Sequence, residues 1–208
     1  MRSKEIEAYK SKLKLTKAQK EILVGTLLGD GHLETQNGRT YRLKIEHSIN
    51  QKEYIDWLYS KFKQWTRTEP KMKLKNGEPS THYFNTYSHG AFRFYAQQFY
   101  VGKEKRIPKL IGKMLTPLSL AIWFMDDGSI KSSKHKSVLF HTLGYEKKEL
   151  EQLQFVLLEK FNLKTSLHKQ KQKYWRIYIK SESMGAFKSL VGPYIITSMK
   201  YKLGNVDA

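Results

Sequence analysis

Two mostly apolar runs stand out in the pattern of hydrophobic and polar positions, and each ends in an aspartate followed by a glycine. They are Leu23–Gly31, which carries Asp30, and Leu120–Gly128, which carries Asp127. Each run is apolar enough to form a buried helix, and glycine commonly closes a helix in a left-handed C-cap. The pattern therefore predicts two buried helices that stop just past their aspartates.

Capping signals upstream predict where both helices begin. Thr16 and Gln19 have the spacing of a capping box, while Thr116 followed by Pro117 places an N-cap before a proline at the first helical position. The two helices should therefore have similar lengths.

A carboxylate at the end of a helix faces the negative end of the helix dipole. This placement costs roughly 0.3–1 kcal/mol unless a cation lies beside it. Because the arrangement occurs twice, it suggests a bound metal ion. The alternative is a pair of ordinary core helices, each with a solvated aspartate at its end.

The remaining pattern alternates as in strands or repeats as in helices. Strands with one apolar and one polar face are predicted over residues 41–47, 71–75, 165–171 and 174–180. Asn37-Gly38 and Asn76-Gly77 are typical hairpin turns. Two helices are predicted by apolar stripes that we assign to the core: Tyr54, Ile55, Leu58, Phe62 and Trp65, then Leu150, Leu153, Leu157 and Phe161.

The repetition extends beyond the two aspartate runs. Lys105 lies 75 residues after Asp30, and Lys202 lies 75 residues after Asp127. Gly90-Ala-Phe92 also recurs as Gly185-Ala-Phe187. Internal repetition of this kind predicts two similar units packed about a pseudo-twofold axis, with the repeated helices at their interface. The two aspartates should then converge.

Composition points to a polyanionic partner. The chain has 38 Lys and Arg against 19 Asp and Glu in 208 residues, a net charge of +19. The alternative is a lysine-rich protein without such a ligand. The absence of cysteine excludes disulfides and cysteine-based zinc sites and fits a reducing compartment. With no apolar run near 18 residues and no signal-like N-terminus, we expect a soluble, intracellular protein without a membrane partner.

The polar faces of the predicted strands suit the major groove of a DNA duplex. Phosphates there give affinity, whereas arginine and amide side chains read base edges. If each sheet covers about one helical turn, the footprint is roughly 20 bp. The alternative for any single lysine is a solvated surface. The candidate DNA-binding residues are Arg39, Arg42, Lys44, Lys71, Lys73, Lys75, His168, Arg176, Tyr178 and Lys180.

These residues resemble the LAGLIDADG homing endonucleases, in the single-chain form with two motifs. Leu23–Gly31 resembles the first motif and Leu120–Gly128 the second, while the stretch Leu115–Gly128 and the ending Tyr201-Lys-Leu203 are most similar to the I-SceI branch. The resemblance covers residues 16–205. It implies an α+β fold of two pseudo-symmetric αββαββα units, whose antiparallel sheets form a DNA-binding saddle. We divide the chain into a basic extension (1–15), a first half (16–113) and a second half (114–208).

The resemblance also implies a set of site residues. Asp30 and Asp127 match the metal-binding acids, and Lys105 and Lys202 match lysines beside the active sites. Glu46 matches an acid that the I-SceI branch carries on a strand, and Gln170 stands near its second-half counterpart, where a DNA contact is equally expected. These six are the candidate catalytic residues. The cofactor expected with two carboxylates is Mg²⁺, with Mn²⁺ as a substitute.

The second motif departs from the family pattern. Small residues favour tight helix packing, and the first motif supplies Gly25 and Gly29, whereas the second has Ile122 and Asp126 at the corresponding places. Asp126 points about 100° away from Asp127 on a helix. We therefore expect asymmetric packing, with Asp126 as a polar or capping partner.

The predicted function is metal-dependent cleavage of both strands of a long, asymmetric DNA target, leaving short 3′ overhangs. Other roles known in this family are the RNA maturase, which assists intron splicing, and the DNA-binding regulator that does not cut. No cysteine is present to support protein splicing. We expect an intron-encoded monomer without a small-molecule cofactor, in a microbial cytoplasm or nucleoid or in an organelle matrix.

Overall fold

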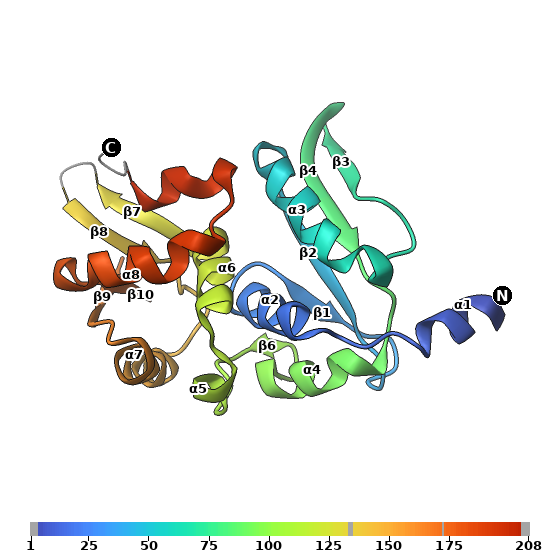
Figure 1. Cartoon of the computed structure of the whole chain (residues 1–208), viewed down its shortest axis with the longest axis horizontal. Helices are drawn as coiled ribbons and strands as arrows, with labels where there is room; N and C mark the ends of the chain where they lie inside the picture. The colour runs from blue at the N-terminus through green and yellow to red at the C-terminus, as the bar shows by residue number, and fades with distance from the viewer. Residues whose placement is uncertain (1–3, 133–134, 172, 205–208) are drawn as a thin grey trace.

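The computed structural model describes residues 4–132, 135–171 and 173–204. In it, the order αββαββα occurs twice, as predicted (Figure 1). The first unit consists of α2 (Lys17–Leu28), β1 (His32–Glu34), β2 (Arg42–Ser48), α3 (Lys52–Phe62), β3 (Lys71–Lys75), β4 (Glu78–Asn85) and α4 (Arg93–Phe99). The second unit consists of α6 (Pro117–Asp127), β7 (Gly128–Ser132), β8 (His135–Phe140), α7 (Lys147–Phe161), β9 (Thr165–Gln170), β10 (Tyr174–Ile179) and α8 (Met184–Val191).

The two four-stranded sheets have the same topology. Their strand orders are β1-β2-β4-β3 and β7-β8-β10-β9, with antiparallel neighbours throughout. The inward residues of β2 and β10, such as Ile45 and Ile177, are fully buried. Helix α3 covers the apolar face of β2 and β4 in the first unit. Helix α7 packs on β9 and β10 in the second unit. The polar faces of both sheets lie on the side away from α3 and α7.

Helices α2 and α6 form the interface between the units and lie at the centre of Figure 1. A Cβ atom added at Gly25 would lie 2.5 Å from Cβ of Ile122, and one added at Gly29 would lie 2.5 Å from Cβ of Asp126. Each first-motif glycine therefore packs against the larger residue at the equivalent place in the second motif. The expected asymmetric packing is confirmed.

Both predicted helix starts are confirmed. The backbone N–H of Gln19 donates to Oγ1 of Thr16, and the backbone N–H of Thr16 donates to Oε1 of Gln19. In the second motif, Thr116 caps α6 ahead of Pro117. These reciprocal bonds satisfy backbone donors that have no partner within the helix.

The predicted left-handed glycine caps are wrong. Neither Gly31 nor Gly128 has a positive φ, and α2 ends at Leu28, before Asp30 is reached. Glycine is required at these places because neighbours approach closely: a Cβ at Gly128 would lie 2.1 Å from the Phe124 ring, and one at Gly31 would lie 2.9 Å from Cβ of Thr26.

Strand β3 also departs from the prediction. Its bounds match, and Asn76 and Gly77 both have positive φ, as a two-residue hairpin turn requires. However, Met72 and Leu74 are 47% and 65% exposed, because β3 is an edge strand that extends beyond the core. The turn at Asn37-Gly38 is instead part of a longer loop between β1 and β2, in which only Gly38 of the pair has a positive φ.

The remaining segments connect or flank the units. Helix α1 (Lys4–Lys10) lies at one end of the first unit, where the Tyr9 hydroxyl donates to the Gln64 carbonyl at 2.8 Å. Strands β5 (Tyr100–Val101) and β6 (Glu104–Lys105) lead to α5 (Ile111–Met114), which packs on α7. The 3-10 segment η6 (Thr197–Leu203) follows α8. No helix in the described part of the chain is long and apolar enough to cross a bilayer.

The close contact between α2 and α6 predicts a strong effect of one added methyl group. Gly25→Ala should lower the free energy of unfolding by about 1–3 kcal/mol, because its Cβ would also lie 2.5 Å from the backbone oxygen of Ser119, which has little room to move. Denaturant titration measures this. The matched control is Gly185→Ala in α8, where a Cβ meets no atom within 4 Å; equal losses in both variants would contradict the packing argument.

Candidate active site

The carboxylates that end the two motifs line one recess. This recess has a volume of about 510 Å³. Asp30 is exposed and Asp127 is half-buried. The predicted convergence of the two aspartates is therefore confirmed. The lining residues are Asp30, Gln51, Asp126, Asp127, Gly128, Ser129, Ile130, His141, Tyr201 and Lys202.

Lys105 and Lys202 contact the carboxyl ends of the two motif helices. Nζ of Lys105 donates to the Gly29 carbonyl at 2.5 Å, and Nζ of Lys202 donates to the Asp126 carbonyl at 3.1 Å and also to that of Met125. Gly29 and Asp126 are equivalent positions, so the two contacts repeat across the pseudo-twofold axis. Each lysine is thus a cation at the negative end of a helix dipole, where a charge of that sign is favourable.

Burial lowers the pKa of both lysines, although the charges of the nearby aspartates act in the opposite direction. The three aspartates named as neighbours are the same for both: Asp30, Asp126 and Asp127. Both lysines therefore lie within electrostatic range of the whole carboxylate cluster.

Asp126 connects the two units. Its Oδ2 accepts a hydrogen bond from the Asp30 backbone N–H at 3.1 Å, and its Oδ1 accepts one from the Tyr54 hydroxyl at 2.7 Å. Burial, followed by the charge of Asp30, raises the pKa of Asp126 to about 8. The side chain binds the backbone that carries Asp30, as expected for a polar or capping partner.

Asp127 is also difficult to ionise. Burial raises its pKa to about 8, and the charges of Asp126 and Asp30 add to the effect, while Lys105 and a hydrogen bond from Trp123 oppose it. A crowded, partly buried set of carboxylates has much to gain from a divalent cation. This feature distinguishes the site from a pair of solvated aspartates.

His47 is a site residue that the sequence analysis missed. Its Nδ1 lies 3.4 Å from Oδ2 of Asp30, and its Nε2 lies 3.6 Å from Oδ1 of Asp126. Burial lowers its pKa, while the Asp30 charge acts to raise it. The signal was present in the alternation of β2, which places His47 on the same buried face as Leu43 and Ile45.

The strand register makes Glu46 and His141 equivalent, rather than Glu46 and Gln170. The ladder between β1 and β2, continued by two residues, places Glu46 opposite Asp30, and the His141 N–H donates to the Asp127 carbonyl at 3.0 Å. Gln170 instead ends the edge strand β9, paired with Tyr174. It is not among the described residues that line the recess.

The two equivalent positions have different surroundings. Glu46 contacts Nζ of Lys73 at 2.6 Å and Nζ of Lys44 at 3.5 Å, on the polar face of the first sheet. His141 lines the recess and shares a hydrogen bond of 2.9 Å with the Ser129 hydroxyl. Burial and the charges of Arg176 and Lys202 lower the pKa of His141. The carboxylate of Glu46 is therefore neutralised by lysines, whereas the imidazole of His141 lines the same recess as the aspartates.

The donor set fits a cation that takes only part of its shell from protein. Among the described residues, no group of three or more His, Cys, Asp and Glu side chains is arranged to hold a metal ion. The described residues thus form no zinc site of the closed, four-ligand type. Mg²⁺ commonly binds through one or two carboxylates, waters and substrate phosphates, and Asp30 and Asp127 at an open recess suit that mode.

The candidate DNA-binding residues lie on the polar faces of the sheets or in their hairpins. Lys73 contacts Glu46 and lies 5.2 Å from the Tyr83 ring centroid, so Lys71, Lys73 and Lys75 share the polar face by alternation. In the second sheet, the His168 and Tyr178 rings lie 4.4 Å apart. Arg39 is exposed in the loop between β1 and β2, and Lys180 is exposed just after β10.

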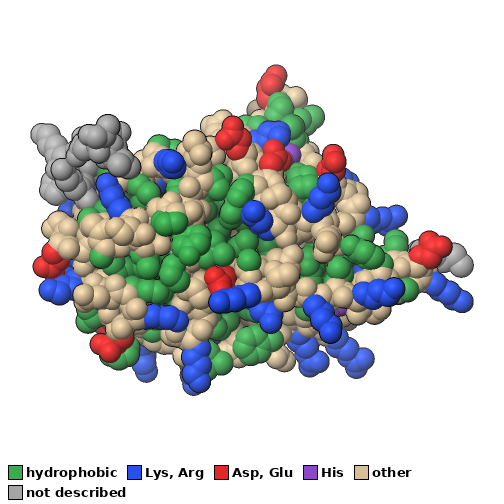
Figure 2. Space-filling model, in the orientation of Figure 1, with side chains coloured by type: hydrophobic (Ala, Val, Ile, Leu, Met, Phe, Trp, Pro, Cys, Tyr) green, Lys and Arg blue, Asp and Glu red, His purple; other side chains and the backbone are tan. Residues whose placement is uncertain are grey.

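Basic side chains are also widespread outside the sheets. Figure 2 shows Lys and Arg projecting mainly along the lower edge and the two sides of one face, with fewer Asp and Glu. This distribution agrees with the net charge of +19. On the sheets, basic side chains lie beside aromatic rings, as Lys73 does with Tyr83 and Lys131 with Tyr178.

Comparison with known proteins finds relatives of two kinds, an endonuclease and a maturase. It is 36% identical over 211 residues to the probable intron-encoded endonuclease 1 of Wickerhamomyces canadensis, covering 97% of this chain and 90% of that protein. It is 34% identical over 200 residues to the cytochrome b mRNA maturase bI2 of Saccharomyces cerevisiae, covering 88% of this chain. The aligned region is only 47% of that maturase, so this chain spans about half its length.

A solved structure of an endonuclease is also similar to this chain. The homing endonuclease I-WcaI, solved bound to its DNA recognition sequence, has a TM-score of 0.91 and 34% sequence identity, covering 97% of this chain and 93% of that one. The model of the LAGLIDADG DNA endonuclease family matches residues 20–187, which include both motifs. The chain therefore belongs to the LAGLIDADG DNA endonuclease family.

Proposed function

We propose that the chain is a site-specific endonuclease that cleaves both strands of a long DNA target with a divalent metal. The observation that carries this proposal is the single recess lined by Asp30 and Asp127, one from each motif, with a lysine at each helix end. The 36% identity to an intron-encoded endonuclease supports it. The target is double-stranded DNA of roughly 20 bp, the span of two sheets of about one helical turn each.

In this mechanism Asp30 and Asp127 would hold the metal, with Mg²⁺ as the proposed ion and Mn²⁺ as a substitute. When bound, such an ion would supply activation of water and stabilisation of charge at the scissile phosphate. Asp126 and His47 hold Asp30 in place through the contacts described above. Lys105 and Lys202 balance the carboxylates and offer positive charge to the reacting phosphates. Cleavage across the minor groove leaves short 3′ overhangs.

Several finer assignments belong to the same proposal. We assign the chain to the I-SceI branch on the motif resemblance, and we propose that it acts as a monomer, because both halves of the pseudo-dimer are present in one chain. Glu46 and Gln170 remain catalytic candidates, although Gln170 has weaker support because it does not line the recess. The cellular compartment and the domain boundaries stay predictions.

Loss of either motif carboxylate should nearly abolish cleavage. Asp30→Asn or Asp127→Asn removes a metal ligand, while DNA affinity stays the same or rises because a negative charge near phosphate is lost. Cutting of a plasmid that carries the selected target, with binding measured in Ca²⁺, separates the two effects. Asp56→Asn on α3 is the matched control, since Asp56 contacts Lys52 and His82 outside the recess. Full cleavage by either motif variant would disprove the assignment.

Metal dependence should change with pH. The raised pKa of Asp127, about 8 without metal, means that a cation displaces a proton at lower pH. The metal concentration for half-maximal cleavage should therefore fall by up to about tenfold per pH unit as pH rises, and level off above the pKa. Asp126→Asn removes a neighbouring like charge, so it should move this profile to lower pH. Identical profiles in the variant and the parent would count against the proposed electrostatics.

A second candidate function is RNA maturase activity, which the 34% identity to a cytochrome b mRNA maturase favours. Binding measurements distinguish the two. If the sheets neutralise about six phosphates, log affinity for the DNA target should fall with log salt at a slope near −5, with or without metal. A slope near zero, or preference for a folded intron RNA over the duplex, would support the maturase instead.

A further inference from the structure

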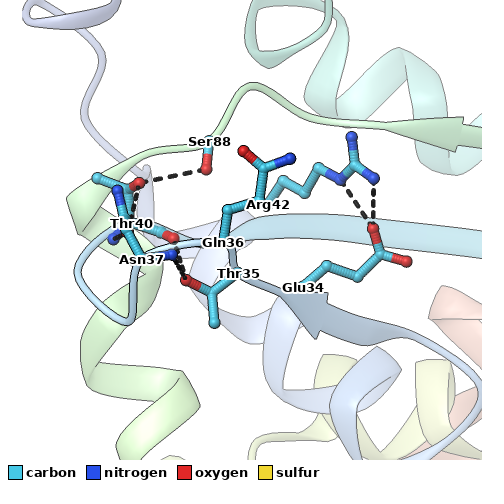
Figure 3. A pocket seen from close by; sticks show the side chains of 7 residues that line it. All are labelled: Glu34, Thr35, Gln36, Asn37, Thr40, Arg42 and Ser88. Atoms are coloured by element: carbon cyan, nitrogen blue, oxygen red, sulfur yellow. Dashed lines mark hydrogen bonds and ion pairs between the residues drawn. The ribbon is translucent and has the colours of Figure 1, made fainter.

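The outer part of the first sheet holds one arginine in a fixed orientation. Glu34 and Arg42 are directly opposite each other in the ladder between β1 and β2. Nε of Arg42 donates to Oε2 of Glu34 at 2.8 Å, and Nη2 lies 2.6 Å from the same oxygen. These contacts use one edge of the guanidinium, so its Nη1–Nη2 edge faces away from Glu34. The pair is drawn in Figure 3.

The hairpin that carries this pair is ordered by its own hydrogen bonds (Figure 3). Oγ1 of Thr35 accepts from the Gly38 N–H at 2.9 Å and donates to the Thr40 carbonyl at 2.8 Å. Oδ1 of Asn37 accepts from the backbone N–H groups of Arg39 and Thr40, each at 2.9 Å. A recess of about 450 Å³ lies beside Arg42. Arg42 therefore lies at the start of β2, next to a loop whose backbone is held by its own hydrogen bonds.

The charge of Glu34 is shared among basic neighbours. Its Oε1 lies 3.2 Å from Nε2 of His32 and 3.7 Å from Nζ of Lys44, in addition to the contact with Arg42. Burial acts to raise the pKa of Glu34, but hydrogen bonds from Arg42 and His32 outweigh it, so the pKa is lowered. Glu34 therefore stays ionised and keeps its hold on the guanidinium.

An arginine paired in this way suits a base edge better than a phosphate. The paired carboxylate cancels most of the long-range attraction that makes lysine and arginine good phosphate ligands. What remains is a planar pair of donors at fixed spacing, which matches the O6 and N7 acceptors of guanine in the major groove. The lysines of β3, by contrast, offer a point charge without a fork.

We propose that Glu34 is a positioning residue that fixes Arg42 for bidentate recognition of a guanine in the outer part of the first half-site. The inference rests on the proposed function, because it requires that the polar face of this sheet lies in the major groove. It adds a specific base and a specific residue pair to that function. An unpaired arginine loses side-chain entropy when it binds a base. Because Glu34 already orders Arg42 in the free protein, binding costs less entropy.

The test is selection of bound and cleaved sites from a duplex library randomised at every position, with the parent and five variants, one of which is Arg42→Ala. Arg42→Lys should keep affinity within a fewfold but reduce preference for guanine at one position by on the order of tenfold or more. Glu34→Gln should also reduce that preference, while affinity for random DNA rises because a negative charge is lost. Glu34→Asp should recover part of the preference, since it keeps the carboxylate. Glu159→Gln, exposed on α7, is the control for charge alone.

The outcomes separate failure of the inference from failure of the proposed function. If Arg42→Lys loses guanine preference and Glu34→Gln keeps it fully, Arg42 reads the base without help and the inference is overturned. If the two variants alter preference at different positions, Glu34 contacts DNA by itself and the inference is also overturned. If Arg42→Lys and Arg42→Ala change neither affinity nor preference, the sheet face does not contact the duplex and the proposed interface fails.

Discussion

Close packing of α2 against α6 is the constraint on which the rest of the molecule depends. Gly25 and Gly29 remove the side chains that would hold the helices apart, and Ile122 and Asp126 occupy the space. The carboxyl ends of the two helices consequently meet, so that three aspartates lie around one recess. The other contacts of the site offset the electrostatic repulsion among the aspartates that this packing creates.

Two sets of contacts reduce this repulsion. Lys105 and Lys202 each bind a helix-end carbonyl, which places a positive charge within range of all three carboxylates. Asp126 is held through Tyr54 and the Asp30 N–H, with its pKa raised. These contacts leave Asp30 and Asp127 at the open side, where a divalent cation and a phosphate would complete the balance. The packing of α2 against α6 therefore also places Asp30 and Asp127 where they would hold the metal.

Much of this arrangement could be predicted from sequence because it repeats. The spacing of Asp30 to Lys105 and of Asp127 to Lys202 identified the two units and their convergence. The prediction of left-handed glycine caps was wrong because capping propensity depends on local sequence and carries no information about packing. Gly128 is required by close approach of the Phe124 ring, which only the folded structure shows. His47 was missed for the same reason, since its importance arises from contacts with a distant helix end.

The two units depart from symmetry in the polar residues of their sheets, as recognition of an asymmetric DNA target requires. On the first sheet, carboxylates face outward among basic residues, with Glu34 on Arg42 and Glu46 on Lys73. At the position equivalent to Glu46, the second unit has His141, which turns to Ser129 and the recess. A symmetric dimer must use one chemistry for both halves of its target. Fusion of two units in one chain removes that restriction, because each sheet then varies its polar face independently while the shared helix interface holds the aspartates together.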